Sequence, residues 1–261
     1  MADTTNTQPG EAAASTSVSG AEALPLLCEF CGYCIEGVPE TGNCPECGRA
    51  IYDSLPERRT GSPWQRRANN RGARNTWRWA VRRPERLFGR IRIDRDTSWS
   101  LRHRSARHAA SWFCLPLLGQ GMAALALGEV GWMMAGLLLA GVLWPMAYLA
   151  FVALIKLEEA GVRFFGRRRG WRVTPSVAVS VCAHASPAWL VGSRLWFVAW
   201  ALVLLFIAGA PPMPGAEVQW VLLLPLLGPL TGLIWFEVLV YIGIRRCRFA
   251  NTARSPSQGL A

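Results

Sequence analysis

The sequence predicts an all-α polytopic membrane helical bundle of four to five spans, preceded by a small cysteine-rich β-hairpin module. Three observations support this class. The chain of 261 residues is 51% hydrophobic, and its apolar residues are concentrated after residue 108. Four of its eight cysteines stand in two pairs near the N-terminus. Between the cysteines and the apolar half lies a basic stretch, with sixteen arginines against four acids in residues 57–107.

The two ends of the chain are predicted to be disordered tails. Residues 1–24 are rich in Ala, Ser, Thr and Gly, with neither a basic n-region nor an apolar stretch, so we expect no secretory signal there. The second tail is expected over residues 249–261. A cysteine quartet without a secretory signal favours a reducing cytosol around the N-terminus.

The paired cysteines predict a metal module over residues 25–53. Their pattern, C-x2-C-x12-C-x2-C, supplies two short turns that bring four thiolates to one point, as a tetrahedral zinc ion requires. All four positions are cysteine, so we expect a closed structural site, because a catalytic zinc keeps one position open for water. So short a segment cannot build its own core, and the metal is expected to supply most of the folding free energy, on the order of 10–16 kcal/mol. The predicted ligands of Zn²⁺ are Cys28, Cys31, Cys44 and Cys47.

Two alternatives remain for this module. One is that the quartet has lost its metal, and the other is that it binds iron instead of zinc. A fifth nearby cysteine, Cys34, is expected to be a bystander rather than a ligand.

Residues 54–107 are predicted to be a basic linker that contains an interfacial helix. Apolar residues recur there at a spacing of three or four, with arginines mostly between them, which is typical of a helix lying along lipid headgroups. Pro84 is expected to kink or end this helix. The apolar stripe consists of Trp77, Val81, Pro84, Phe88 and Ile91.

The same stretch has a second interpretation as a nucleic-acid interface. Aromatic residues among arginines can stack on bases, and the candidates are Trp64, Trp77, Trp79 and Trp99. We favour anionic lipid as the partner of this surface, because the basic run adjoins the first predicted span.

Residues 108–248 are predicted to form the transmembrane helical domain. A span needs about 20 apolar residues to cross about 30 Å of hydrocarbon. Segment 173–193 meets this test less well, because serines and His184 dilute it, and Glu237 interrupts the last apolar run. The segments that meet it well are 109–128, 130–155, 195–216 and 218–244.

The distribution of basic residues predicts the orientation. The flank before the first span, the loop 156–172 and the C-terminal tail are basic, whereas the connections near Glu129 and around 211–217 contain no lysine or arginine. The positive-inside rule then favours four spans with both termini cytoplasmic and segment 173–193 interfacial or re-entrant. If 173–193 spans, there are five crossings and the basic tail lies outside.

Two parts of the chain resemble known families. The stretch CEFCGYCIEGVPETGNCPECG resembles the N-terminal zinc ribbons of many bacterial membrane proteins. The stretches AHASPAWLVG (183–192) and FEVLVYIGIRRCRFAN (236–251) resemble the Yip-type (Ypt-interacting protein) membrane family. This resemblance implies a helical bundle of about five spans with a cytoplasmic N-terminus. We expect the protein to be integral to the cell (inner) membrane. Eukaryotic members are linked to vesicle trafficking and small GTPases, and we do not carry that role over.

The chain departs from these families at two points. Cys34 stands where such ribbons usually have a polar residue that is not a ligand. The basic C-terminal tail fits poorly with an odd number of spans.

Polar residues within the apolar half are the remaining candidates for chemistry. His184 lies two residues from Cys182, but on a helix the two would point about 200° apart, so they do not form a nucleophile–base pair. Glu237 is a proton or ion site, lies near the cytoplasmic face or, as we favour, pairs with an arginine such as Arg194 across the bundle. The adjacent carboxylates at 158 and 159 are expected to point in different directions. Helix kinks and close helix packing are expected at Gly141, Pro145, Gly228 and Pro229.

Together these patterns predict a non-enzymatic integral membrane adaptor or scaffold that presents a cytosolic zinc ribbon to a protein partner, with anionic headgroups holding the arginine-rich segment. Two alternatives come from other classes. One is a small-molecule or ion transporter or channel that uses polar residues in the bundle. The other is a membrane-tethered nucleic-acid binder.

Overall fold

The computed structural model describes residues 24–126, 128–209 and 223–252. Most of the two predicted tails, 1–24 and 249–261, therefore lies outside the described residues. The described part is mainly helical and contains no strand. The elements are η1 (Ile51–Ser54), η2 (Pro56–Arg58), α1 (Pro63–Arg66), α2 (Asn70–Arg82), α3 (Pro84–Phe88), α4 (Arg95–Ala126), α5 (Val130–Arg168), α6 (Pro175–Ala185), α7 (Pro187–Gly209), η3 (Leu224–Leu226) and α9 (Leu227–Cys247).

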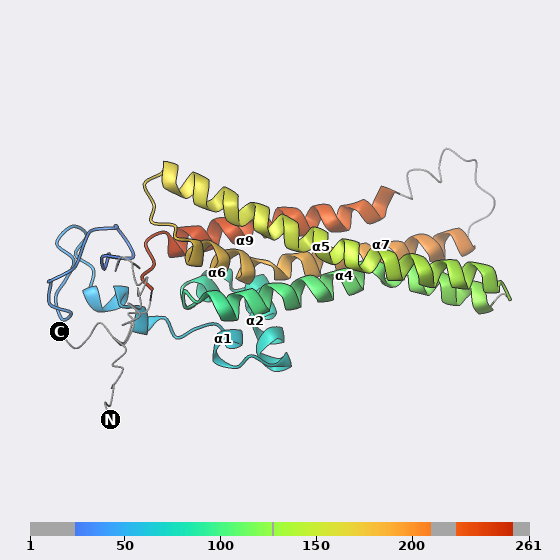
Figure 1. Cartoon of the computed structure of the whole chain (residues 1–261), viewed down its shortest axis with the longest axis horizontal. Coiled ribbons are helices and arrows are strands. Elements are labelled where there is room, and N and C mark those ends of the chain that lie inside the picture. Colours follow the sequence, from blue (N-terminus) through green and yellow to red (C-terminus); the bar gives the residue numbers. More distant parts are fainter. Residues whose placement is uncertain (1–23, 127, 210–222, 253–261) are drawn as a thin grey trace, which may run out of the picture.

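The molecule is elongated, with the cysteine-rich segment at one end of a bundle of long helices (Figure 1). Helices α4, α5, α7 and α9 run along the length of the bundle. The connection from α4 to α5 and the C-terminal end of α7 lie at the end far from the cysteines, whereas α5 and α9 both finish near them. Successive long helices therefore alternate in direction.

Three helical segments among the described residues are long and apolar enough to cross a membrane. They are Val130–Arg168, Pro175–Phe206 and Leu224–Cys247. The predicted span 109–128 coincides with the second half of α4. Parts of the predicted spans 109–128, 195–216 and 218–244 lie outside the described residues. The chain thus has an apolar helical domain suited to a membrane.

The weakly apolar segment 173–193 forms α6 and the first turns of α7. Thr174 caps α6 by accepting a hydrogen bond from the Val177 N–H, and Pro175 stands at the first helical position. Ser186 ends α6 in a helical backbone conformation, and α7 begins at the next residue. The segment is almost completely buried by protein, so the serines and histidine that lower its hydropathy face other side chains.

The segment predicted as a linker, 54–107, is folded into η1, η2, α1–α3 and the start of α4. Ser62 and Gln65 form a capping box at α1. Helix α2 ends at Arg82 and Pro84 begins α3, so the helix ends at this proline as predicted. The stripe predicted to face lipid is partly internal, because Phe88 and Ile91 are completely buried in the main core. The predicted boundary between residues 107 and 108 falls inside α4.

Close helix contacts occur at glycines, but only partly at those predicted. A Cβ on Gly228 of α9 would lie 2.3 Å from the Trp196 backbone nitrogen of α7, and a Cβ on Gly192 would lie 2.8 Å from the Gly232 Cα. In contrast, Gly141 has nothing within 4 Å of its Cβ position, so it contributes no close packing. Backbones approach closely only where the missing side chain faces a neighbour.

Candidate metal centre

Each cysteine pair is built on a tight turn, and the first contains Cys28 and Cys31. The Cys28 N–H donates to the Tyr33 carbonyl (2.8 Å), and the Gly32 N–H donates to the Cys28 carbonyl (2.9 Å). Gly32 has a φ of +84°, in the left-handed region that glycine adopts without a steric cost.

The second turn repeats the first with the same offsets. The Cys44 N–H donates to the Arg49 carbonyl (2.7 Å), and the Gly48 N–H donates to the Cys44 carbonyl (2.8 Å), with a φ of +70° at Gly48. Each turn is closed by one isolated antiparallel bridge, and the two bridges are Leu27–Cys34 and Asn43–Ala50. The predicted β-hairpin is thus represented among the described residues by two single bridges instead of strands.

The four cysteine sulfurs lie at distances suited to a shared metal ion. Cys28 Sγ is 3.7 Å from Cys47 Sγ, Cys31 Sγ is 3.6 Å from Cys44 Sγ, and all four sulfurs lie within 4.8 Å of one another. A tetrahedron with metal–sulfur bonds of about 2.3 Å has edges of about 3.8 Å, whereas a disulfide bond would be about 2.05 Å. The quartet is therefore placed to hold a metal ion, and the exposed Cys34 lies outside it.

The surroundings of the sulfurs favour a bound cation. Desolvation by itself would raise the pKa of the Cys28 thiol, but the backbone N–H groups of Cys31 and Phe30 lower that pKa to about 7. Desolvation and the adjacent sulfurs raise the pKa of Cys31 to about 12. Four neighbouring thiolates repel one another, so all four ionise together only with a cation between them.

A small apolar core surrounds this site. Leu26, Ile35, Ile51 and Leu55 are buried around the inner cysteines, and Cys28 and Cys44 are each only 1% exposed. All four potential ligand positions are thiols. This arrangement is suited to a structural ion and leaves no protein-built open position for a substrate.

The cysteine module, residues 24–55, is attached to the bundle through Arg59. The Arg59 side chain is 5% exposed, and its Nε and Nη2 donate to Glu29 at 2.9 and 2.8 Å. Its Nη1 donates to the carbonyls of Phe88 and Ile91, and its Nη2 also donates to the carbonyl of Arg246. One guanidinium therefore joins the module to α3 and to the end of α9.

Asn251 makes a second attachment, in a part of the chain that we predicted to be a disordered tail. Its side-chain Oδ1 accepts from the Leu27 N–H (3.1 Å), and its Nδ2 donates to the carbonyls of Leu27 (2.7 Å) and Ser54 (2.8 Å). Arg172, in the loop after α5, donates to the same Oδ1. Asn251 is 3% exposed, so the chain after α9 is ordered at least to this residue because the module holds it.

His184 is buried within the protein and does not meet solvent. Its Nδ1 lies 2.7 Å from the Ser180 carbonyl and therefore donates, which leaves Nε2 to accept from the Ser62 hydroxyl at 2.9 Å. This Ser–His pair has the geometry of a base and a nucleophile, but both residues are completely buried and Ser62 also caps α1. The pair joins α1 to α6 and has no access for a substrate.

The acidic residues of the bundle do not form the predicted pair. Glu237 is exposed, and the Arg194 guanidinium instead lies 5.3 Å from the centre of the Trp112 ring. Among the described residues, the buried ion pair of the bundle joins Arg102 to Glu159 at 2.6 Å. Its neighbour Glu158 lines a small groove between α5 and α9 together with Glu237, so the two adjacent carboxylates do point apart.

The tryptophans of the basic segment are mostly committed to packing. Trp64 is 4% exposed and donates from Nε1 to the Thr97 carbonyl, and Trp77 donates to the Ser105 hydroxyl. Trp79 is half-buried, and Trp99 is exposed. Two of the four aromatic candidates for base stacking are therefore held inside the fold.

Sequence reasoning missed Arg59 and Asn251, which attach the module. Each is one polar residue in a long sequence, and its partners lie 30 and 224 positions away, so no local spacing marks it.

Comparison with protein-family models, curated proteins and solved structures finds no match to this chain.

Proposed function

We propose that this protein is an integral membrane adaptor that presents a zinc-bound cysteine module to a protein partner on the cytosolic side of the inner membrane. The observation that carries this proposal is the closed site of four cysteines, fixed to the basic end of an apolar helical bundle. A metal with no open position holds a shape and has no place for a substrate.

Zinc is the metal that we propose for this site. Four thiolates in a tetrahedral arrangement suit zinc or iron. We choose zinc because it has no redox chemistry, which suits a site with a structural role. The two equivalent turns, each closed by one bridge, support a minimal zinc ribbon. The resemblance to bacterial zinc ribbons and to the Yip-type family remains part of this proposal.

We further propose four crossings with both termini cytoplasmic. The alternating directions of α4, α5, α7 and α9 support this topology, since both chain ends then lie on the side of the module. Helix α6 is enclosed by α2, α4, α5 and α9, which supports a place on the cytosolic side, with α7 making the crossing. The arginines before α4, after α5 and after α9 then all lie inside.

The partner surface that we propose is the outer face of the module. Two of its aromatic side chains are well exposed although the module has a core of its own, and they are Tyr33 (42%) and Tyr52 (50%). Exposed aromatic residues are enriched at protein interfaces. The exposed arginines of α2 are suited to anionic headgroups.

Metal analysis of the purified full chain tests the proposal. We expect one zinc ion per chain, lost in a Cys44→Ser/Cys47→Ser variant and retained in the matched Cys34→Ser variant. Inductively coupled plasma mass spectrometry identifies the metal and its stoichiometry. Iron in place of zinc would contradict the metal assignment, and a chain that stays metal-free after expression with added zinc would contradict the whole proposal.

A further inference from the structure

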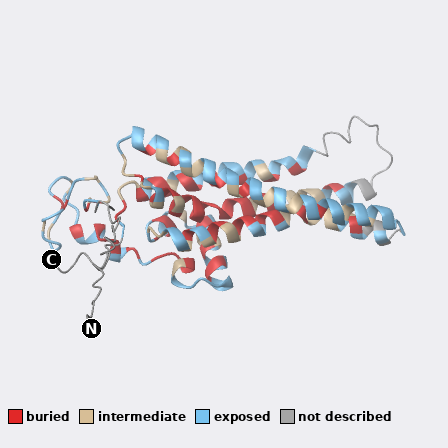
Figure 2. Cartoon of the chain, viewed as in Figure 1, coloured by how far each residue is buried: buried red, intermediate tan, exposed pale blue. Residues whose placement is uncertain are grey.

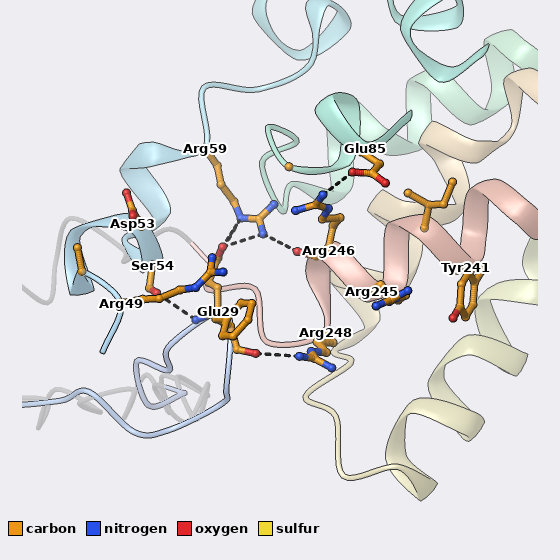
Figure 3. A pocket seen from close by; sticks show the side chains of 14 residues that line it. Glu29, Arg49, Asp53, Ser54, Arg59, Glu85, Tyr241, Arg245, Arg246 and Arg248 are labelled. Atoms are coloured by element: carbon orange, nitrogen blue, oxygen red, sulfur yellow. Dashed lines mark hydrogen bonds and ion pairs between the residues drawn. The ribbon is translucent and has the colours of Figure 1, made fainter. Parts of the chain in front are cut away.

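A cavity lies between the cysteine module and the C-terminal end of α9, away from the metal ligands. Its volume is about 490 Å³, within the usual range for small-molecule sites. The module contributes Arg49 and Asp53 to its lining, and α9 contributes Tyr241 and Arg245 (Figure 3). The cavity therefore exists only because the module is fixed against the helix.

The lining carries more positive than negative charge. It includes five guanidinium groups and three carboxylates. Arg59 pairs with Glu29, and Arg246 pairs with Glu85, which uses two charges of each sign. The remaining arginines of the lining are Arg49, Arg245 and Arg248, and they form no ion pair within the described residues. The one carboxylate of the lining that is left to balance their charge is that of Asp53. The cavity thus has a net excess of two positive charges.

Two of these arginines are held on aromatic rings. The Arg49 guanidinium carbon lies 3.6 Å from the centre of the Phe30 ring, and that of Arg245 lies 5.7 Å from the centre of the Tyr241 ring. Stacking fixes the guanidinium plane and leaves its N–H edge available for a planar or tetrahedral oxyanion. One nitrogen of the Arg248 guanidinium, Nη2, already donates to the Phe30 carbonyl, so fewer of its N–H groups are available to a ligand.

Membrane topology alone does not account for this cluster. Arginines at the end of α9 are favoured by the helix dipole and by the positive-inside rule. Neither effect applies to Arg49, which follows the second cysteine turn and reaches the same cavity from the opposite wall. Like charges brought together from two separate elements are stabilised when an anion lies between them.

We propose that this cavity binds a small phosphate-bearing ligand, with Arg49 and Arg245 donating to the phosphate from opposite walls. Guanidinium groups bind phosphate through paired N–H···O bonds. The lining also includes the apolar side chain of Ile242, beside which the part of the ligand attached to the phosphate can lie. The phosphate belongs either to a lipid headgroup or to a soluble molecule.

The test uses the full chain in nanodiscs of two compositions. In neutral phosphatidylcholine nanodiscs, inorganic pyrophosphate is titrated by calorimetry. In nanodiscs that also contain phosphatidic acid, native mass spectrometry measures the lipid retained per chain. Arg49→Gln and Arg245→Gln are compared with Arg167→Gln, which makes the same charge change at an exposed position at the end of α5, outside the cavity. Thermal unfolding midpoints show that each variant is folded.

We expect one binding event per chain, weakened at least about tenfold in the two cavity variants and unchanged in Arg167→Gln. Pyrophosphate binding in neutral nanodiscs indicates a soluble ligand, whereas retention of phosphatidic acid alone indicates a headgroup. Equal losses in all three variants, or no loss in the cavity variants, would overturn the proposal. If a cavity variant does not fold, Ala50→Glu places a carboxylate at the exposed rim and is expected to abolish binding. Metal content is measured on the same samples, so a failure of the zinc assignment is seen separately.

Discussion

The two halves of the helical bundle use the same kinds of residue in different surroundings. Near the cysteine module, α6 and the neighbouring parts of α4 and α9 form a core whose members, such as Val181 and Phe236, are almost fully buried (Figure 2). In the far half, large apolar side chains face outward, with Leu205 70% and Trp132 71% exposed. Apolar surface of that extent requires a cover from outside the chain.

This difference is the one expected of helices that are covered by protein at one end and by lipid at the other. Near the module, α1, α2 and α3 from the basic segment pack against the long helices, whereas the far half has no such layer among the described residues. Helix α5 has 39 residues and is about 58 Å long, nearly twice the thickness of a hydrocarbon core of about 30 Å. A single helix is therefore long enough to extend well beyond a hydrocarbon core.

Truncation of one large side chain in each half is the strongest test of this comparison. Phe88 is completely buried, so Phe88→Ala is expected to lower the free energy of unfolding by about 3–5 kcal/mol. Leu205→Ala removes a side chain that faces outward, and a change below about 0.5 kcal/mol is expected in micelles. Unfolding of both variants with sodium dodecyl sulfate measures the two values. Similar losses would show that a second chain covers the far half.

The sequence predicts those features of the fold that depend on residues close together in the chain. The cysteine quartet follows from two turns of four residues, and the long helices follow from uncharged runs. The fold of segment 54–107 does not follow, because the buried face of α2 consists of small residues, Gly72, Ala73, Thr76 and Ala80, which hydropathy patterns do not mark. Segment 173–193 was similarly obscured, because its polar side chains find partners inside the core. The Ser180 hydroxyl bonds to the Ser98 hydroxyl and the Asp94 carbonyl, and His184 bonds to the Ser180 carbonyl and the Ser62 hydroxyl.

The attachment of the module provides the second test, and it concerns the near half alone. Arg59→Met would leave the nearly buried Glu29 carboxylate without its cation, and a loss of about 3 kcal/mol is expected. The exposed pair of Glu85 and Arg246 offers a matched control, since Glu85→Gln is expected to change stability by less than about 1 kcal/mol. Detergent unfolding gives both values. If Arg59→Met and Glu85→Gln behave alike, the module is not held by this contact.

The smallest expected effects distinguish the two kinds of glycine in the spanning helices. At Gly228 a Cβ would lie 2.3 Å from the Trp196 backbone nitrogen, so Gly228→Ala must push α9 away from α7 and is expected to cost about 1–3 kcal/mol. At Gly141 the Cβ position is open, so Gly141→Ala is expected to stabilise α5 by about 0.5 kcal/mol through reduced backbone entropy.

The opposite signs of these two changes are the informative result, because both substitutions add the same methyl group to an apolar helix. A loss at both positions would place Gly141 against a neighbour, which would be a second copy of the chain. A gain at both would mean that α7 and α9 do not approach through Gly228 in the membrane. The far half would then be held together mainly by the lipid around it, in contrast to the side-chain core of the near half.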